Sequence, residues 1–244
     1  MQDLPGKGIR AVSLLSGGLD SSTLLGLVVS MGYDVTALSF DYGQRHSREI
    51  RSAKMVAEHY GVEHKIMRID LRAIGGSALT DDIEVPEYGI DEIGSKIPVT
   101  YVPARNTILL SVALGLAEVL EAAKIFIGAN YLDYSGYPDC RPEYFEAMNN
   151  LFKVATKRTV EGDRIEVEAP LLKYTKADIV KLALKLKVPI ELTWSCYRGG
   201  RAACGRCDSC KLRLKGFMEA GARDPLEYEV YPDFYRSYLA AKDG

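Results

Sequence analysis

The chain has 244 residues, of which 47% are hydrophobic and 26% charged, and its formal net charge is -2. A chain of this length and composition buries a full hydrophobic core, which excludes general disorder. The small net charge excludes attraction of the whole protein to nucleic acid or to an anionic membrane, so we expect small-molecule partners and no obligatory nucleic acid. The longest apolar run, residues 108–117, is shorter than the roughly 18 residues that cross a bilayer, and residues 1–15 lack a secretory pattern. We therefore expect a cytoplasmic protein without membrane contact.

The hydrophobic pattern alternates between strand and helix from the start of the chain. Residues 9–15 form a continuous apolar run typical of a buried strand, and a glycine-rich turn separates this run from an apolar helix at 21–31. A second strand, a helix and a third strand are predicted at 35–40, 49–60 and 64–69. This alternation predicts an α/β fold with a doubly wound parallel sheet, in which helices cover both faces.

Periodicity fades over residues 70–99, where glycine and proline interrupt the chain. A stretch of this kind predicts a long loop or lid over a site. Regular elements then resume, with helices predicted at 105–123, 142–155 and 178–186 and a strand at 124–128.

The segment Ser16-Gly17-Gly18-Leu19-Asp20-Ser21-Ser22 joins the first strand to the first helix. Its glycines let the backbone approach a ligand closely, and the N–H groups at the start of the helix converge on an anion. The three serine hydroxyls add donors for phosphate oxygens, and Asp20 is placed to hold Mg²⁺ against them. The sequence lacks the lysine of a Walker A loop and a G-x-G-x-x-G dinucleotide fingerprint, which disfavours kinases and dehydrogenases. We interpret the segment as a pyrophosphate cradle.

Four of the five cysteines form the pattern Cys204-x-x-Cys207-x-x-Cys210, with Cys196 eight residues earlier. Four thiolates in so short a segment predict a metal site in a reducing compartment rather than disulfides. The spacing alone leaves structural zinc and an iron–sulfur cluster open. The basic residues around the cysteines either offset the thiolate charge or form a local RNA-binding patch. We expect two units, residues 1–193 as the α/β domain and 194–244 as a small C-terminal metal-binding segment.

The glycine-rich loop resembles the PP-loop of the N-type ATP pyrophosphatases, which cleave ATP between its alpha and beta phosphates and transfer AMP to a substrate oxygen. Further strings along nearly the whole chain resemble the 7-cyano-7-deazaguanine synthase family: Phe40-Asp41-Tyr42-Gly43-Gln44-Arg45-His46, Val102-Pro103-Ala104-Arg105-Asn106 and Asp133-Tyr134-Ser135-Gly136-Tyr137-Pro138-Asp139-Cys140-Arg141. Members of that family often have glycine where Ala104 stands. The resemblance implies the PP-loop (adenine nucleotide alpha hydrolase-like) fold, ATP as co-substrate with Mg²⁺, structural zinc at the four cysteines, and a homodimer.

The loop and the resemblance together assign expected roles to particular residues. The expected catalytic residues are Ser16, Asp20, Ser21, Arg105 and Lys176. The expected ATP-binding residues are Leu15, Ser16, Gly17, Gly18, Leu19, Asp20, Ser21, Ser22, Thr23, Leu24, Leu25, Phe40, Gln44 and Gly128. The expected substrate residues are Asn106, Asp133, Ser135, Gly136, Tyr137, Asp139 and Arg141. In that pocket Asp133 or Asp139 accepts from the guanine-like edge, Tyr137 stacks on the base, and Arg141 pairs with the substrate carboxylate. The fifth cysteine, Cys140, has no identifiable histidine partner and is interpreted as a packing or pocket-wall residue.

The implied reaction converts 7-carboxy-7-deazaguanine and ammonia to 7-cyano-7-deazaguanine, a precursor of queuosine and archaeosine, with release of AMP and diphosphate. The carboxylate is adenylated and attacked by ammonia to give an amide, whose oxygen is then adenylated so that elimination yields the nitrile. Because the sequence shows no glutaminase domain, we expect free ammonia as the nitrogen source. The sequence leaves three alternatives open: a product that stops at the amide, a PP-loop enzyme that thiolates tRNA, and a nucleotide-binding or zinc-dependent interaction module without turnover.

Overall fold

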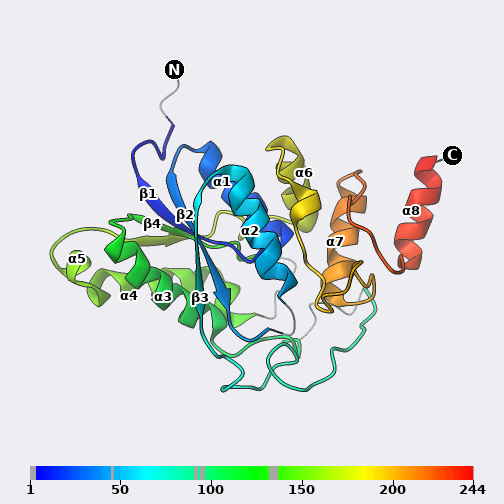
Figure 1. Ribbon diagram of the computed structural model, residues 1–244, viewed down its shortest axis with the longest axis horizontal. Coiled ribbons are helices and arrows are strands. Elements are labelled where there is room, and N and C mark those ends of the chain that lie inside the picture. The colour runs from blue at the N-terminus through cyan, green and yellow to red at the C-terminus, as the bar shows by residue number, and fades with distance from the viewer. Residues whose placement is uncertain (1–3, 45–46, 91–92, 94–96, 132–136, 244) are drawn as a thin grey trace.

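A parallel five-stranded sheet forms the centre of the computed structural model, which describes residues 4–44, 47–90, 93, 97–131 and 137–243 (Figure 1). Its strands are β1 (Arg10–Leu14), β2 (Asp34–Asp41), β3 (Glu63–Arg68), β4 (Lys124–Phe126) and β5 (Glu166–Glu168). Neighbouring strands are parallel throughout, in the order β3-β2-β1-β4-β5. The predicted α/β class with a parallel sheet is confirmed.

Helices cover both faces of this sheet, as a doubly wound fold requires. One face carries α1 (Leu19–Ser30), α2 (Arg48–Tyr60) and α6 (Lys176–Lys185), and the other carries α3 (Arg105–Val119) and α4 (Pro142–Ala155). Side chains alternate along β1, because successive residues of a strand point to opposite faces. Ala11 joins the core under α1, whereas Val12 and Leu14 join the core under α3 and α4.

The strand order reverses beside β1, since β2 pairs with one edge of β1 and β4 with the other. In open α/β sheets, ligands bind at such a switch point, outside the carboxyl ends of the strands. The PP-loop follows β1 here, and Gly128 follows β4 close to it. A Cβ on Gly128 would lie 3.2 Å from the backbone of Ser21.

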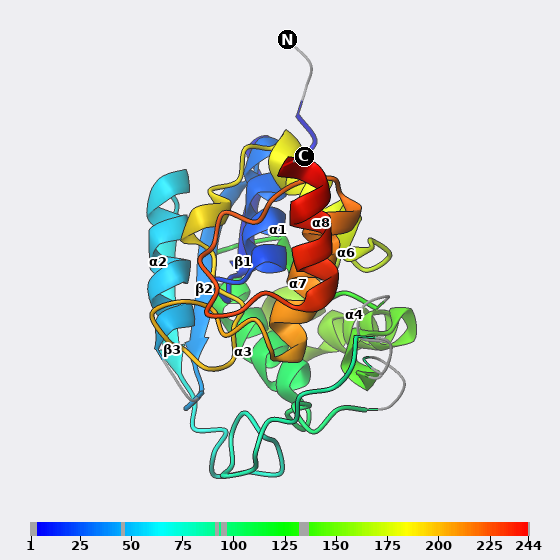
Figure 2. The ribbon, with the colours of Figure 1, turned by 90° about the vertical axis from the view of Figure 1, so that its right-hand side faces the viewer.

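The C-terminal segment packs on the same core as the α/β domain. It contains α7 (Asp208–Glu219), which packs beside α6, and α8 (Asp233–Asp243), which packs beside α7 (Figure 1 and Figure 2). Leu214, Phe217 and Tyr235 belong to the same hydrophobic cluster as Leu24 and Leu25 of α1. The division at 193/194 stays a prediction, with residues on its two sides sharing one core.

Most predicted elements are present, and the differences lie where the pattern is short. The helix predicted at 105–123 ends at Val119, because Glu121 takes a left-handed conformation, with φ of 52°, before β4. Strand β5 was not predicted, since only Val167 of its three residues is buried. Short elements also follow α4 and flank the site: α5 (Lys157–Val160), η1 (Pro138–Cys140) and η2 (Ile190–Leu192).

The predicted loop at 70–99 contains no helix or strand among its described residues, and it is anchored by the buried Leu71 and Ala78. Nowhere in the described ranges does a helix combine the length and the hydropathy needed to cross a bilayer.

Candidate active site

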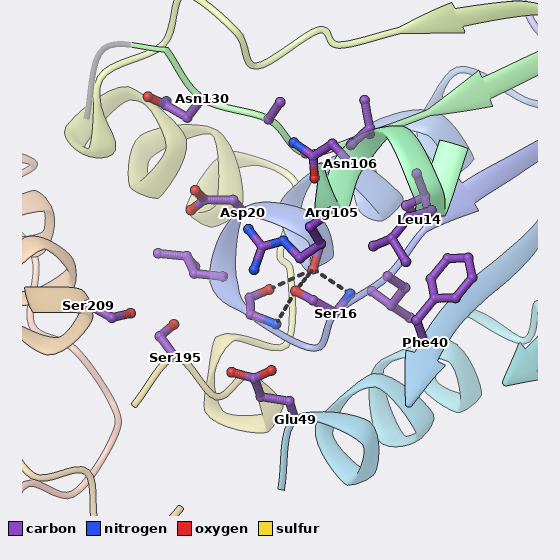
Figure 3. A pocket seen from close by; sticks show the side chains of 18 of the residues that line it. Leu14, Ser16, Asp20, Phe40, Glu49, Arg105, Asn106, Asn130, Ser195 and Ser209 are labelled. Carbon is purple, nitrogen blue, oxygen red and sulfur yellow. Dashed lines mark hydrogen bonds between the residues drawn. The ribbon is translucent and has the colours of Figure 1, made fainter. Parts of the chain in front are cut away.

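A cavity of about 320 Å³ opens at the carboxyl ends of β1, β2 and β4. The side chains of Asp20, Arg105 and Glu49 lie around the PP-loop residue Ser16 (Figure 3). The lining includes thirteen of the residues singled out in the sequence: Leu15, Ser16, Gly18, Leu19, Asp20, Ser21, Phe40, Gln44, Arg105, Asn106, Gly128, Tyr137 and Lys176. The fold thus brings together residues from the loop, from the end of β2 and from the start of α3.

The PP-loop is held in shape by its own hydroxyl groups. The backbone N–H of Ser16 donates to Ser21 Oγ at 3.1 Å, and Gly18 N–H donates to Ser16 Oγ at 3.2 Å. The two hydroxyl oxygens lie 3.0 Å apart. Because Gly18 caps α1 without a side-chain hydrogen bond, the first N–H groups of the helix are available to an anion.

Gly17 is required by both conformation and space. Its φ is +84°, in the left-handed region, and a Cβ there would lie 2.3 Å from the Glu49 carbonyl oxygen and 2.6 Å from the Ala53 nitrogen. The first turn of α2 therefore sits directly on the loop. Any larger residue at position 17 separates the two.

Asp20 and Lys176 form an ion pair across the cavity. Lys176 Nζ donates to both Asp20 carboxylate oxygens, at 2.8 and 2.6 Å, with the side chains 12% and 24% exposed respectively. Lys176 begins α6, where Thr175 and Asp178 form a capping box. The expected role of Asp20 in holding Mg²⁺ stays a prediction. In this structure its two oxygens accept from the lysine.

Arg105 supplies a buried cation between the loop and the predicted base pocket. Burial alone lowers the pKa of its guanidinium, but the neighbouring Tyr42, Tyr137 and Asp139 raise that pKa above its ordinary value. Burial raises the pKa of Tyr42, and Arg105 partly offsets the rise. Arg105 therefore remains charged beside the phosphate site, which suits an anionic ligand.

The predicted substrate residues fall into three groups. Asn106 and Tyr137 line the cavity, and the Tyr137 hydroxyl lies 3.2 Å from Thr100 Oγ1. Asp139 does not line it. Its carboxylate accepts from the Asn106 backbone N–H at 3.1 Å and so holds the first turn of α3. Arg141 is exposed at the start of α4 and likewise lies outside the lining.

The remaining substrate residues, Asp133, Ser135 and Gly136, lie outside the described part of the chain. Five predicted ATP-binding residues lie outside the lining of the cavity, because the loop packs the first of them against α2 and α1 turns the other four into the core. These are Gly17, Ser22, Thr23, Leu24 and Leu25. The Ser22 hydroxyl, expected at a phosphate oxygen, is buried and has no hydrogen-bond partner among the described residues. The structure does not bring it into the lining.

The structure adds lining residues that the sequence reasoning did not select, among them Tyr42, Glu49, Asn130 and Trp194. Tyr42 lies within a recognised string, and Glu49 opens the helix after it, so both carried a signal. Burial raises the pKa of the Glu49 carboxyl to about 7, although Arg105 acts in the opposite direction. Cys140 also lines the cavity, as interpreted from the sequence, and burial raises the pKa of its thiol to about 11.

The four remaining cysteines gather into one buried cluster. The sulfur atoms of Cys196, Cys204, Cys207 and Cys210 lie within 4.8 Å of one another. Backbone N–H groups donate to these sulfurs, including Cys204 N–H to Cys196 Sγ at 3.3 Å. Sulfurs this close, with backbone donors that stabilise thiolates, could hold a tetrahedral metal ion. A Cβ on Gly205 would lie 1.8 Å from the Val230 carbonyl oxygen, so the turn between two ligands requires glycine.

The cysteine-rich segment contacts both the PP-loop and the long loop at 70–99. Trp194 N–H donates to the Gly17 carbonyl oxygen at 2.8 Å. Arg198 forms an ion pair with Glu87 at 2.6 Å, and Lys211 Nζ donates to the Tyr88 carbonyl oxygen at 2.5 Å. The cysteine cluster, the long loop and the phosphate cradle are therefore physically connected.

The family model for queuosine biosynthesis protein QueC matches residues 10–221. The chain belongs to the QueC family. Its relatives include proteins named 7-cyano-7-deazaguanine synthase. The one from Thermoplasma acidophilum is 60% identical over 230 residues, which cover 94% of this chain and 96% of the relative. Those from Picrophilus torridus and Cellvibrio japonicus are 60% and 55% identical, covering 96% and 90% of this chain and 97% of each relative.

Among solved structures, NMN synthetase from Francisella tularensis superposes on this QueC family member with a TM-score of 0.47 at 16% identity, covering 97% of this chain and 84% of that chain. These values are too low to support an argument about function. Family membership, by contrast, confirms the resemblance read from the sequence motifs.

Proposed function

We propose that the protein is an ATP-dependent carbon–nitrogen ligase that converts 7-carboxy-7-deazaguanine and ammonia to 7-cyano-7-deazaguanine, with release of AMP and diphosphate. One observation carries the proposal. A single cavity is lined by Ser16 and Gly18 of a phosphate cradle and by Asn106 and Tyr137 of a polar, aromatic pocket. Relatives that bear the synthase name align over 94% and 96% of this chain.

The chemistry requires an activated carboxylate, because the oxygen of a free carboxylate cannot leave. Transfer of AMP to this oxygen makes it a good leaving group and releases diphosphate. The N–H groups at the start of α1 and the Ser16 and Ser21 hydroxyls bind the diphosphate, while Arg105 and Lys176 stabilise the charge that develops on it. Mg²⁺, when bound, would neutralise part of the phosphate charge, with Asp20 as its expected ligand.

The base pocket would orient the deazaguanine ring against the activated phosphate. The Tyr137 ring is suited to stacking, and Asn106 is held by hydrogen bonds to the Asp139 carbonyl at 3.1 Å. Asp133, Ser135, Gly136, Asp139 and Arg141 remain proposed substrate residues. Leu79, from the long loop, lines the same cavity and supports a role of that loop in excluding water from the adenylate.

Two further features belong to the proposal. The four buried sulfurs suit a structural zinc ion, which has no redox role and prefers a closed tetrahedral site. We also propose a cytoplasmic homodimer. Clustered free thiols favour a reducing compartment, and exposed apolar side chains on α3, α4 and α5 offer a contact surface: Val119, Leu151, Val154 and Val160. Light scattering of the purified protein measures the mass directly.

The decisive experiment is mass spectrometry of reactions with purified protein, Mg²⁺-ATP, ammonium and 7-carboxy-7-deazaguanine, following the base and the adenine nucleotide together. Nitrile with AMP supports the full proposal, and amide with AMP keeps the chemistry while changing the product. An unchanged base without AMP, from folded protein of measured metal content, contradicts the proposal.

A matched reaction with tRNA and a sulfur donor tests the thiolation alternative. Formation of thiolated tRNA would contradict the proposed synthase activity and support the thiolation alternative. The same protein with Arg105→Lys serves as an active-site control, because lysine keeps the charge but loses the planar donor geometry.

A further inference from the structure

The lining of the cavity contains two carboxylates within the described part of the chain, Asp20 and Glu49. Lys176 binds both oxygens of Asp20. The Glu49 carboxylate has no hydrogen bond and no ion pair with any described residue. It is nevertheless half-buried and lines the cavity beside Ser16 (Figure 3).

The position of Glu49 is fixed by contact between two rigid elements. Its backbone carbonyl lies against Gly17, so that no side chain fits between the loop and the first turn of α2. The side chain of the neighbouring Arg48 points away from the Glu49 carboxylate. Arg48 stacks on the Trp194 ring, 3.7 Å from the centroid, and donates to the carbonyl oxygens of Gly200 and Arg201. Arg48 therefore supplies no counter-charge to Glu49, and the cation that acts on its carboxyl is Arg105, across the cavity.

A carboxylate beside a phosphate cradle is unfavourable for phosphate binding, because like charges repel at short distance in a partly buried site. The cations Arg105 and Lys176 and the loop N–H groups suit the anion, whereas Glu49 is suited to a small ligand that donates N–H groups. The proposed function requires such a ligand in the same cavity, since ammonia must attack the activated carbonyl carbon.

We propose that Glu49 binds the ammonia nucleophile, an inference that rests on the proposed function. The carboxylate accepts one N–H of the bound ammonia and directs the nitrogen lone pair at the carbonyl carbon of the acyl adenylate. The new C–N bond forms, the C–O bond to AMP breaks, and AMP leaves with the electron pair. The proton lost by nitrogen passes to the Glu49 carboxylate and then to water. A base in this position typically accelerates such a step by about 10²–10⁴.

The test separates adenylation from ammonia attack in Glu49→Gln and Glu49→Asp. Exchange of labelled diphosphate into ATP, with 7-carboxy-7-deazaguanine and no ammonium, measures adenylation alone. The steady-state rate against ammonium concentration measures kcat/KM for the nucleophile. We expect exchange within about threefold of the unaltered protein and a fall of about 10² or more in kcat/KM for ammonium in Glu49→Gln. Glu49→Asp recovers part of this loss.

Glu58→Gln is the matched control, because Glu58 lies on the same helix with its side chain 65% exposed and outside the cavity. It should change neither measurement. Equal losses of exchange and of ammonium dependence in Glu49→Gln would assign the carboxylate to ATP or its metal and overturn the proposal. An unchanged kcat/KM for ammonium would also overturn it. If the unaltered protein shows no exchange with the deazaguanine acid, the proposed function itself fails, which is a distinct result.

Discussion

Trp194 donates its backbone N–H to the carbonyl oxygen of Gly17, at 2.8 Å. This bond joins the first residue of the cysteine-rich segment to the middle of the PP-loop. The indole N–H of Trp194 donates in turn to the Cys196 carbonyl at 2.9 Å. The position of the phosphate cradle thus depends on a residue that is held by a metal-ligand candidate.

Metal removal should therefore weaken ATP binding. Without a metal the four thiolates repel one another, the segment loosens, and Trp194 no longer fixes the loop. We expect the Kd for ATP to rise at least about tenfold, equivalent to about 1.4 kcal/mol. Calorimetric titration of ATP, before and after chelation, measures the change.

Reconstitution with Zn²⁺ is the control for the chelation experiment, and elemental analysis reports the metal content in each state. Recovery of the original Kd on reconstitution is expected. Folded, metal-free protein that binds ATP with an unchanged Kd would show that the Trp194–Gly17 contact does not transmit the effect.

Gly216→Ala should lower activity without contacting any ligand. Gly216 lies in α7, and an added Cβ would lie 2.3 Å from Lys176 Cγ and 3.1 Å from its backbone carbon. The lysine must move away from Asp20, and misplacement of a catalytic group by about 1 Å can cost about 10² in rate. Steady-state release of AMP measures the loss.

Gly115→Ala is the matched control, because Gly115 is also helical but its added Cβ meets no described atom within 4 Å beyond its own helix backbone. Activity should persist there, with a gain of up to about 1 kcal/mol in the free energy of unfolding. If Gly216→Ala retains full activity, the close packing of α7 against Lys176 does not position the lysine.

The sequence predicted the sheet, the phosphate loop and the cysteine cluster because each is a local signal. The phosphate loop can be recognised from Ser16 to Ser21 alone. The cysteine cluster can be recognised from the spacing between Cys204 and Cys210. Glu49 and Trp194 were not selected, because their place depends on how α2 and the C-terminal segment dock on the loop. Asp139 shows a different case. Its ligand role stays a prediction, and the structure adds a positioning role that the sequence did not indicate, because its carboxylate holds the start of α3.

Cys140 should resist alkylation in the native protein. Burial raises the pKa of its thiol to about 11, so the thiolate that reacts is scarce at pH 8. We expect iodoacetamide to leave the peptide containing Cys140 unmodified, as read by mass spectrometry, with or without a chelator. The four clustered cysteines should become reactive once the metal is removed. Rapid labelling of Cys140 at pH 8 would contradict its assignment as a buried wall residue.

Ala104→Gly should stabilise the protein. Ala104 caps α3 with φ of 54° and ψ of 20°, in the left-handed region, where a Cβ costs about 1–2 kcal/mol. Glycine removes this cost, although the greater freedom of the unfolded chain returns about 0.4–1 kcal/mol of it. Urea unfolding should therefore show a gain of up to about 1 kcal/mol in the free energy of unfolding.

The control is Ala113→Gly, in the buried middle of the same helix, where the same change should destabilise the protein by about 1 kcal/mol or more. Opposite signs at the two positions are expected, because Ala104 is exposed with a left-handed backbone, whereas Ala113 is helical and its methyl group packs in the core. Destabilisation at both positions would mean that the Ala104 methyl group contributes more through packing than its backbone conformation costs.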